Sequence, residues 1–246
     1  MQIQNQIVVI TGAGGGIGAA LASACLQQGA RAIVALDLHI QGAPAGCDAR
    51  VCDVTREDEF VALMRSIEAD YGRIDLFCSN AGVLTPGWDV READFALWER
   101  DWKINGQAHG IAAKTVLPGM IERGSGYLLN TVSAAGLLSS PESAIYSTTK
   151  HAALGLAEYL AFTYKRFGIG VSALCPMAVR TPMLENLART GGTAGLEGVL
   201  TTEDVVAATL QGISEERFLI LPHPRVAEHY AKKAAHHDRW LAAMEG

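Results

Sequence analysis

The chain has 246 residues, 49% of them hydrophobic and 19% charged, a composition typical of a globular protein with a substantial core and not of a disordered one. Its net charge of −6 and its pI near 5.6 argue against a nucleic-acid partner, because phosphate binding needs clustered lysine and arginine. No apolar run approaches the roughly 20 residues that a membrane-spanning helix needs, and the polar start does not resemble a signal peptide.

Short apolar runs alternate with helical patterns along the whole sequence. The runs are nearly continuous, which is typical of strands buried on both faces of a parallel sheet. Because no break in composition interrupts the alternation, we expect a single α/β domain over residues 1–246, with about seven strands in a doubly wound parallel sheet and helices on both faces. The predicted strands are 6–11, 32–37, 49–54, 75–80, 126–133, 170–176 and 217–222, and the predicted helices are 17–28, 56–71, 95–121, 146–167, 202–213 and 226–243. A mobile substrate loop is expected around 183–200.

A glycine-rich segment, "TGAGGGIG" from Thr11 to Gly18, joins the first strand to the first helix. Glycines let the backbone turn tightly and approach a pyrophosphate, which the free N–H groups of the helix start then bind. The spacing is Thr-Gly-x-x-x-Gly-x-Gly, through Gly12, Gly16 and Gly18, because position 17 is isoleucine. The segment predicts a dinucleotide site in a Rossmann-type fold.

Asp37 ends the second strand, about 20 residues after the glycines, where an acid can accept hydrogen bonds from the adenosine ribose. Its charge would repel a 2′-phosphate, and residues 32–49 contain no lysine or arginine. Both observations favour NAD over NADP as the cofactor.

Tyr146 precedes Lys150 by four residues in "SAIYSTTKHAALG", so the two side chains share one face of a predicted helix. A phenol with a pKa of about 10 in water is thereby held beside an ammonium group. This spacing arises often by chance, and it becomes informative only together with other motifs.

Taken in order, these motifs resemble the short-chain dehydrogenase/reductase family, and the resemblance extends over nearly the whole chain. Asp53 and Val54 resemble the family's adenine-contacting pair, and Thr181 resembles the residue that contacts the nicotinamide carboxamide. The cofactor-binding residues that the resemblance implies are Gly12, Gly16, Ile17, Gly18, Asp37, Asp53, Val54, Asn80, Ala81, Gly82, Tyr146, Lys150, Pro176 and Thr181.

The resemblance also implies a catalytic tetrad of Asn105, Ser133, Tyr146 and Lys150, and hydride transfer between a secondary alcohol or ketone and a nicotinamide. Tyr146 would be the general acid/base, with a pKa lowered by Lys150 and by the oxidised nicotinamide. Lys150 would also hold the ribose hydroxyls. Ser133 would bind the substrate oxygen. Asn105, at the place of the family's helix-kinking asparagine, would help to hold a water of the proton path.

Met177 departs from the family pattern, which has glycine after the proline that follows the sixth strand. The expected substrate walls are mostly apolar, so we expect a hydrophobic or aromatic secondary alcohol or ketone; only Arg180 or Arg189 offers a charge for a carboxylate. These walls are 134–138, Ser143, 177–179 and the excursion 183–200, with Leu137, Leu138, Val179, Met183, Leu184 and Leu187 as their apolar members.

Three other functions remain open. A biosynthetic ketoreductase acting on acyl thioesters is one, although Asp37 counts against it because such enzymes usually resemble the NADP-preferring members. A non-catalytic NAD sensor is another, and the complete tetrad counts against it. Ser147 and Lys150 also match the Ser-x-x-Lys signature of penicillin-recognising hydrolases, but the companion Ser-Asp-Asn and Lys-Thr-Gly motifs are missing from the sequence.

The remaining features concern the location of the protein, its oligomeric state and metal binding. Five scattered cysteines suggest a reducing compartment, so the expected location is the cytoplasm. The helices predicted over 95–121 and 146–167 are expected to form a homodimer or homotetramer, as in most family members. No metal site is predicted, because the late histidines show no ligand spacing and are interpreted as solvated helix residues: His223, His229, His236 and His237.

Overall fold

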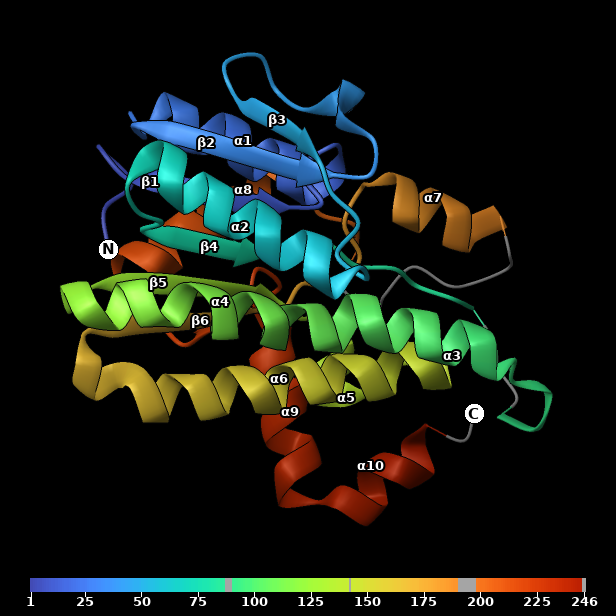
Figure 1. Ribbon diagram of the computed structural model, residues 1–246. Helices are drawn as coiled ribbons and strands as arrows, with labels where there is room; N and C mark the ends of the chain where they lie inside the picture. Colours follow the sequence, from blue (N-terminus) through green and yellow to red (C-terminus); the bar gives the residue numbers. More distant parts are fainter. Residues whose placement is uncertain (87–89, 142, 190–197, 245–246) are drawn as a thin grey trace.

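Seven parallel strands form one sheet in the computed structural model, which describes residues 1–86, 90–141, 143–189 and 198–244 (Figure 1). The strand order is β3-β2-β1-β4-β5-β6-β7, which reverses beside β1, and ligands of such sheets bind at the carboxyl ends of the strands next to that reversal. The predicted fold class is confirmed. The strands are β1 (Ile7–Thr11), β2 (Ala32–Asp37), β3 (Asp48–Val51), β4 (Leu76–Ser79), β5 (Gly126–Thr131), β6 (Ile169–Leu174) and β7 (Leu219–Ile220).

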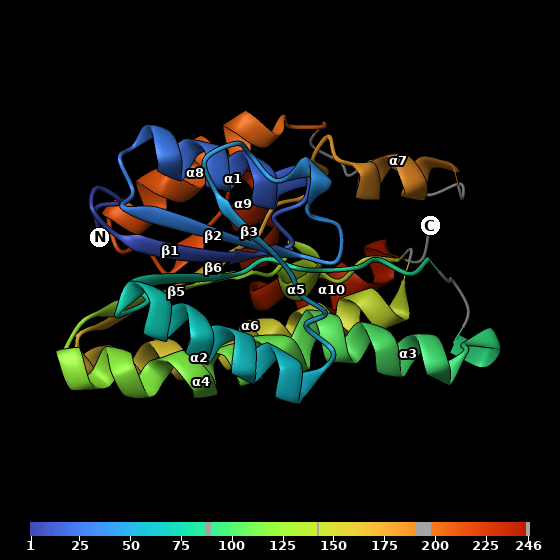
Figure 2. The ribbon, with the colours of Figure 1, turned by 45° about the horizontal axis from the view of Figure 1, so that its top comes forward.

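Helices cover both faces of the sheet (Figure 2). On one face, α1 (Gly16–Gln27) and α8 (Thr202–Ser214) enclose an apolar core that includes Leu21 and Val205. On the other face, α2 (Glu57–Tyr71), α4 (Ala108–Arg123) and α6 (Ala144–Tyr164) enclose a second core that includes Phe60 and Leu154. Because both faces are covered, the unbroken apolar runs of the strands are buried, as parallel sheets require.

The helix predicted over 95–121 is divided in the structure. It begins as α3 (Phe95–Trp102), continues through a π-helical turn (Lys103–Gln107) and resumes as α4. Asn105 lies in that turn, and π-helical insertions of this kind are frequent at functional sites.

Several predicted boundaries are wrong by a few residues. The strands predicted over 49–54 and 217–222 are Asp48–Val51 and Leu219–Ile220 in the structure. The last helix, predicted over 226–243, is broken at His236, whose non-helical backbone (φ −143°, ψ 64°) separates α9 (Arg225–Ala235) from α10 (His237–Ala243).

The excursion predicted over 183–200 as a mobile loop begins as helix α7 (Pro182–Arg189), so its first part is not a loop. Residues 190–197 lie outside the described part of the chain. Short helical turns complete the described elements: η1 (Ile40–Gly42), η2 (Val90–Glu92), α5 (Ala135–Leu138) and η4 (Lys165–Phe167). Across the described ranges, none of the helices combines the length and apolarity needed to cross a bilayer.

Candidate active site

The turn between β1 and α1 is built from backbone that excludes side chains. Gly12 and Gly16 have positive φ angles of 69° and 53°, a conformation that glycine adopts without strain. A Cβ on Gly18 would lie 2.1 Å from the carbonyl oxygen of Gly12, so only glycine fits there. Gly15, the N-cap of α1, provides no side-chain cap and faces open space. The free N–H groups of the helix start and the space above them therefore fit a pyrophosphate.

Asn80 fixes this turn to the neighbouring strands. Its Nδ2 donates to the carbonyl oxygens of Thr11 (3.0 Å) and Gly12 (3.3 Å), and its Oδ1 accepts from Thr131 Oγ1 (3.1 Å). The Thr11 hydroxyl in turn accepts from the backbone N–H groups of Asn80 and Ala81. The carboxyl ends of β1, β4 and β5 are thereby held in one arrangement.

Asp37 lies beside the glycine turn. Its carboxylate accepts hydrogen bonds from Gly14 N (2.9 Å) and His39 N (3.0 Å), which fix its orientation. A carboxylate has about four acceptor positions, so two remain for ribose hydroxyls.

Asp53 and Val54, the predicted adenine contacts, follow β3. Asp53 is turned toward its own loop, where it accepts from the backbone N and the hydroxyl of Thr55. A surface hollow of about 500 Å³ extends from Leu38 to Asp53 and Phe60, beside the place expected for adenine. Val54 is buried.

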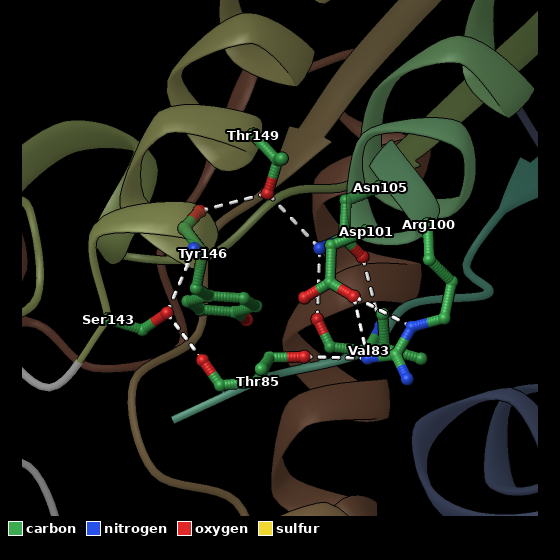
Figure 3. Close-up of polar contacts among 8 residues, drawn as sticks. All are labelled: Val83, Thr85, Arg100, Asp101, Asn105, Ser143, Tyr146 and Thr149. Atoms are coloured by element: carbon green, nitrogen blue, oxygen red, sulfur yellow. Dashed lines mark hydrogen bonds and ion pairs between the residues drawn. The ribbon is translucent and has the colours of Figure 1, made fainter. Parts of the chain in front are cut away.

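The π-helical turn presents Asn105 to two neighbouring segments (Figure 3). Its Oδ1 accepts from Val83 N at 2.9 Å, and its Nδ2 donates to Val83 O (2.9 Å) and to Thr149 Oγ1 (3.1 Å). The Thr149 hydroxyl then donates to the carbonyl oxygen of Tyr146. Asn105, which is fully buried, therefore connects the segment that follows Asn80, Ala81 and Gly82 to α6.

A second set of contacts reaches the start of α6 in the same view (Figure 3). Ser143 Oγ accepts from Tyr146 N (3.1 Å), as the N-cap of the helix, and donates to Thr85 O (2.6 Å). Thr85 Oγ1 accepts from Arg100, whose guanidinium also pairs with the buried Asp101. The segment 83–85 is thus attached both to α6 and to α3.

Ser133, Tyr146 and Lys150 converge at the carboxyl end of β5. Lys150 is 2% exposed, its Nζ donates to Thr131 O (3.0 Å), and the same Nζ lies 5.6 Å from the centre of the Tyr146 ring. A Cβ on Gly82 would lie 3.3 Å from Asn105 Oδ1 and 3.5 Å from Lys150 Nζ. The structure therefore brings the predicted tetrad together beside the predicted cofactor residues.

Burial alters the protonation of this group. It lowers the pKa of Lys150 from 10.5 to about 8, because a charged ammonium is poorly solvated there. Burial also raises the pKa of Tyr146, and a hydrogen bond with Ser133 opposes that rise only in part. In the chain by itself, burial therefore moves the pKa of Tyr146 in the direction opposite to the predicted lowering.

The turn after β6 contains the departure at Met177. Pro176 O accepts from Ala134 N (2.8 Å) and, at 3.4 Å, from Ser133 Oγ. Met177 N donates to Nδ1 of His223 at 3.2 Å. His223 is 2% exposed and precedes α9, so its interpretation as a solvated helix residue was wrong.

Thr181 lies against the glycine turn, since a Cβ on Gly16 would be 3.3 Å from its Cγ2. Two predicted cofactor residues that are 165 positions apart in the sequence, Gly16 and Thr181, therefore lie close together in space. Ile17, beside Gly16, packs partly buried against the core under α1.

Two expected substrate walls take other roles. Ala134, Leu137 and Leu138 are each less than 8% exposed and belong to the core. Ser143 is buried as a helix cap. The sequence gives no signal that α9 packs against α5 and covers the side on which these residues lie.

The sequence analysis assigned no role to the side chains of Thr11, Thr149 and His223, which support the site through hydrogen bonds to residues far along the chain. Thr11 had a signal as the first residue of the glycine motif, whereas Thr149 had none. His223 had one, because it stands between Pro222 and Pro224 in "LPHP", a turn between the last strand and α9. Within the described ranges, no group of three or more histidine, cysteine or acidic side chains is placed to hold a metal ion.

Comparisons with known proteins agree with this geometry. The family described as short chain dehydrogenase matches residues 6–191, and the chain therefore belongs to that family. A 1-deoxy-11-beta-hydroxypentalenate dehydrogenase of Streptomyces exfoliatus is 32% identical over 231 residues, covering 89% of this chain and 84% of that protein. A 2,5-dichloro-2,5-cyclohexadiene-1,4-diol dehydrogenase of Sphingobium indicum is 33% identical over 208 residues, covering 81% and 82%.

Among solved structures, a short chain dehydrogenase/reductase from Burkholderia phymatum in complex with NAD superposes with a TM-score of 0.86 and 26% identity, covering 96% of this chain and 95% of that one. Together with the dehydrogenase relatives, this makes the chain an oxidoreductase of the short-chain dehydrogenase family.

Proposed function

We propose that the protein is an NAD-dependent oxidoreductase that interconverts a hydrophobic secondary alcohol and its ketone, with all 246 residues in one catalytic domain. The observation that carries this proposal is the convergence of Ser133, Tyr146, Lys150 and Asn105 beside the glycine turn and Gly82. A nicotinamide cofactor bound there supplies the hydride acceptor or donor. The residues that would hold it are those predicted from the sequence.

NAD is favoured over NADP by Asp37. Two backbone N–H groups hold the Asp37 carboxylate in place beside the glycine turn, so a 2′-phosphate would meet a fixed negative charge. The same feature argues against an acyl-thioester ketoreductase.

Tyr146 is the general acid/base of the proposal. In alcohol oxidation its phenolate would take the hydroxyl proton of the substrate while Ser133 Oγ holds the substrate oxygen. Lys150, close to the ring, favours the phenolate when its ammonium is charged, and a pKa of about 8 makes that charge sensitive to pH near neutrality.

An apolar substrate is supported by the relatives and by the neighbourhood of Tyr146. Several relatives are named as dehydrogenases of hydroxylated carbon skeletons, among them the pentalenate and cyclohexadiene-diol enzymes. Met177 follows β6 near Ser133 and offers partly buried apolar surface, whereas Val179, another expected wall, is buried in the core under α1 and α8. Arg180 is exposed one residue further on and provides a charge for a substrate carboxylate.

A homodimer or homotetramer is supported by the outer face of α4 and α6. A hollow of about 420 Å³ lies there, and its lining includes Trp102, Gly106 and Leu156. On α6, Tyr159 and Phe162 form an aromatic pair that is largely exposed, 52% and 71%. Large exposed apolar patches of this kind mark contact surfaces. Five free cysteines favour a reducing compartment, the cytoplasm.

The first test measures the rates at which the protein oxidises cyclic, aryl and aliphatic alcohols with NAD and with NADP. The wild-type protein should prefer NAD and oxidise apolar secondary alcohols. Tyr146→Phe removes only the hydroxyl and should lower kcat by about 10² to 10⁴ while NAD still binds. Turnover close to wild type in Tyr146→Phe would refute the role of Tyr146. A preference for NADP would refute the role of Asp37. NAD binding without turnover of any alcohol would favour a non-catalytic sensor.

A further inference from the structure

We propose that His223 is a positioning residue of the active site, which holds the Pro176–Met177 turn and through it places Ser133. The proposal rests on the proposed function, since Ser133 matters only if the site handles an alcohol or ketone. His223 lies between β7 and α9, far along the chain from every residue of the tetrad.

His223 contributes an acceptor to the turn. Its Nδ1 faces Met177 N at 3.2 Å, and both belong to the buried or partly buried interior. Accepting that hydrogen bond requires Nδ1 to be unprotonated, so the hydrogen of the neutral ring is on Nε2. The His223 carbonyl oxygen meanwhile accepts from Val226 N (3.1 Å) at the start of α9, which fixes its backbone.

Hydrogen bonds from two sides fix the turn. On the side of β5, Ala134 N and Ser133 Oγ donate to Pro176 O. On the side of β7, Ile220 O accepts from Cys175 N (2.9 Å), and Nδ1 of His223 accepts from Met177 N, two residues further along the chain. β7 has only two residues, so its backbone contact ends with Ile220 and Cys175. The hydrogen bond between His223 and Met177 therefore supports the turn beyond the end of the short strand.

The support from His223 matters because of the residue at position 177. Met177 has a side chain where the family pattern has glycine, and that side chain packs partly buried against the apolar core. A displacement of its backbone would move Pro176 O, the shared acceptor of Ser133 Oγ and Ala134 N. Shifts of about 1 Å in a catalytic arrangement can lower turnover by roughly 10².

Two variants separate the hydrogen bond from simple packing. Asn is smaller than histidine but places its Oδ1 where Nδ1 of histidine lies, whereas Leu fills similar space without an acceptor. We expect His223→Leu to lower kcat/KM for the alcohol about tenfold or more, with a change in KM for NAD below about threefold. His223→Asn should recover most of the loss. His237→Leu, at an exposed histidine of α10, is the matched control and should match wild type.

A folded His223→Leu protein with wild-type kcat/KM, or an Asn variant as impaired as the Leu variant, would overturn the proposal. Hydrogen exchange of the Met177 amide in the wild-type protein tests the contact without any variant: slow exchange is expected, and exchange at the rate of an open loop would also overturn it. Failure of the proposed function would appear differently, as absent alcohol turnover in the wild type with the Met177 amide still protected.

Discussion

The two halves of the carboxyl edge are constructed in different ways. The cofactor half, on β1, β2 and β4, is mostly backbone: glycines without side chains, an uncapped helix start and N–H groups directed at Asp37. The catalytic half, from β5 to β7, is held by buried polar side chains that form hydrogen bonds over long sequence separations, such as Asn105 with Thr149 and His223 with the backbone N–H of Met177. The first half should therefore fail when atoms are added, and the second when atoms are removed.

Gly18→Ala should have the largest effect on NAD affinity of the substitutions that follow. The added methyl would lie 2.1 Å from Gly12 O and 2.6 Å from Asn80 Nδ2, so the turn must move away from the geometry that receives a pyrophosphate. We expect affinity for NAD, measured by calorimetry, to fall at least about 100-fold, a loss of about 2.7 kcal/mol or more.

Gly15→Ala sharpens the same test, because a Cβ there meets no protein atom within 4 Å. Its melting temperature should equal that of wild type, so any loss of NAD binding reports contact with the cofactor itself. Unchanged affinity in Gly18→Ala would contradict the backbone account of this half.

Lys150→Met tests the catalytic half through pH. The folded-state pKa of Lys150, about 8, is below its ordinary value of 10.5, so between these values the unfolded chain binds more protons. This group therefore destabilises the fold below pH 8 and ceases to do so as pH rises toward 10.5. The free energy of unfolding of Lys150→Met minus that of wild type should fall by about 3 kcal/mol between pH 7 and pH 10.5, as measured by urea unfolding of the cofactor-free proteins. A constant difference across that range would contradict the lowered pKa.

Ser143→Ala should have the smallest effect. It removes the N-cap of α6 and the donor to Thr85 O, at a cost of about 1–2 kcal/mol. Because the cap adjoins Tyr146, kcat should also fall a few-fold. Thr201→Ala removes the N-cap of α8, on the opposite face of the sheet, and should lower the melting temperature without changing kcat. Equal kcat values in both variants would show that Ser143 acts only on stability.

Much of the cofactor half could be predicted because its signals are local. The glycine spacing, the strand before it, the helix after it and Asp37 all lie within residues 7–37, and each reflects backbone geometry that few residue types permit. The alternation of apolar runs and helices was enough to predict the parallel sheet, because covered strands must be apolar throughout.

The sequence by itself determined the fold class and the family, and its motifs predicted the tetrad, since these depend on residue types in a characteristic order along the chain. Only the tertiary structure decided what supports those residues. It turned Ser143 from a pocket wall into a helix cap, buried Leu137 and Leu138 in the core, and brought His223 to the Met177 turn. It also showed that burial raises the pKa of Tyr146, because desolvation depends on everything that packs around a group and leaves no mark in the spacing of the sequence.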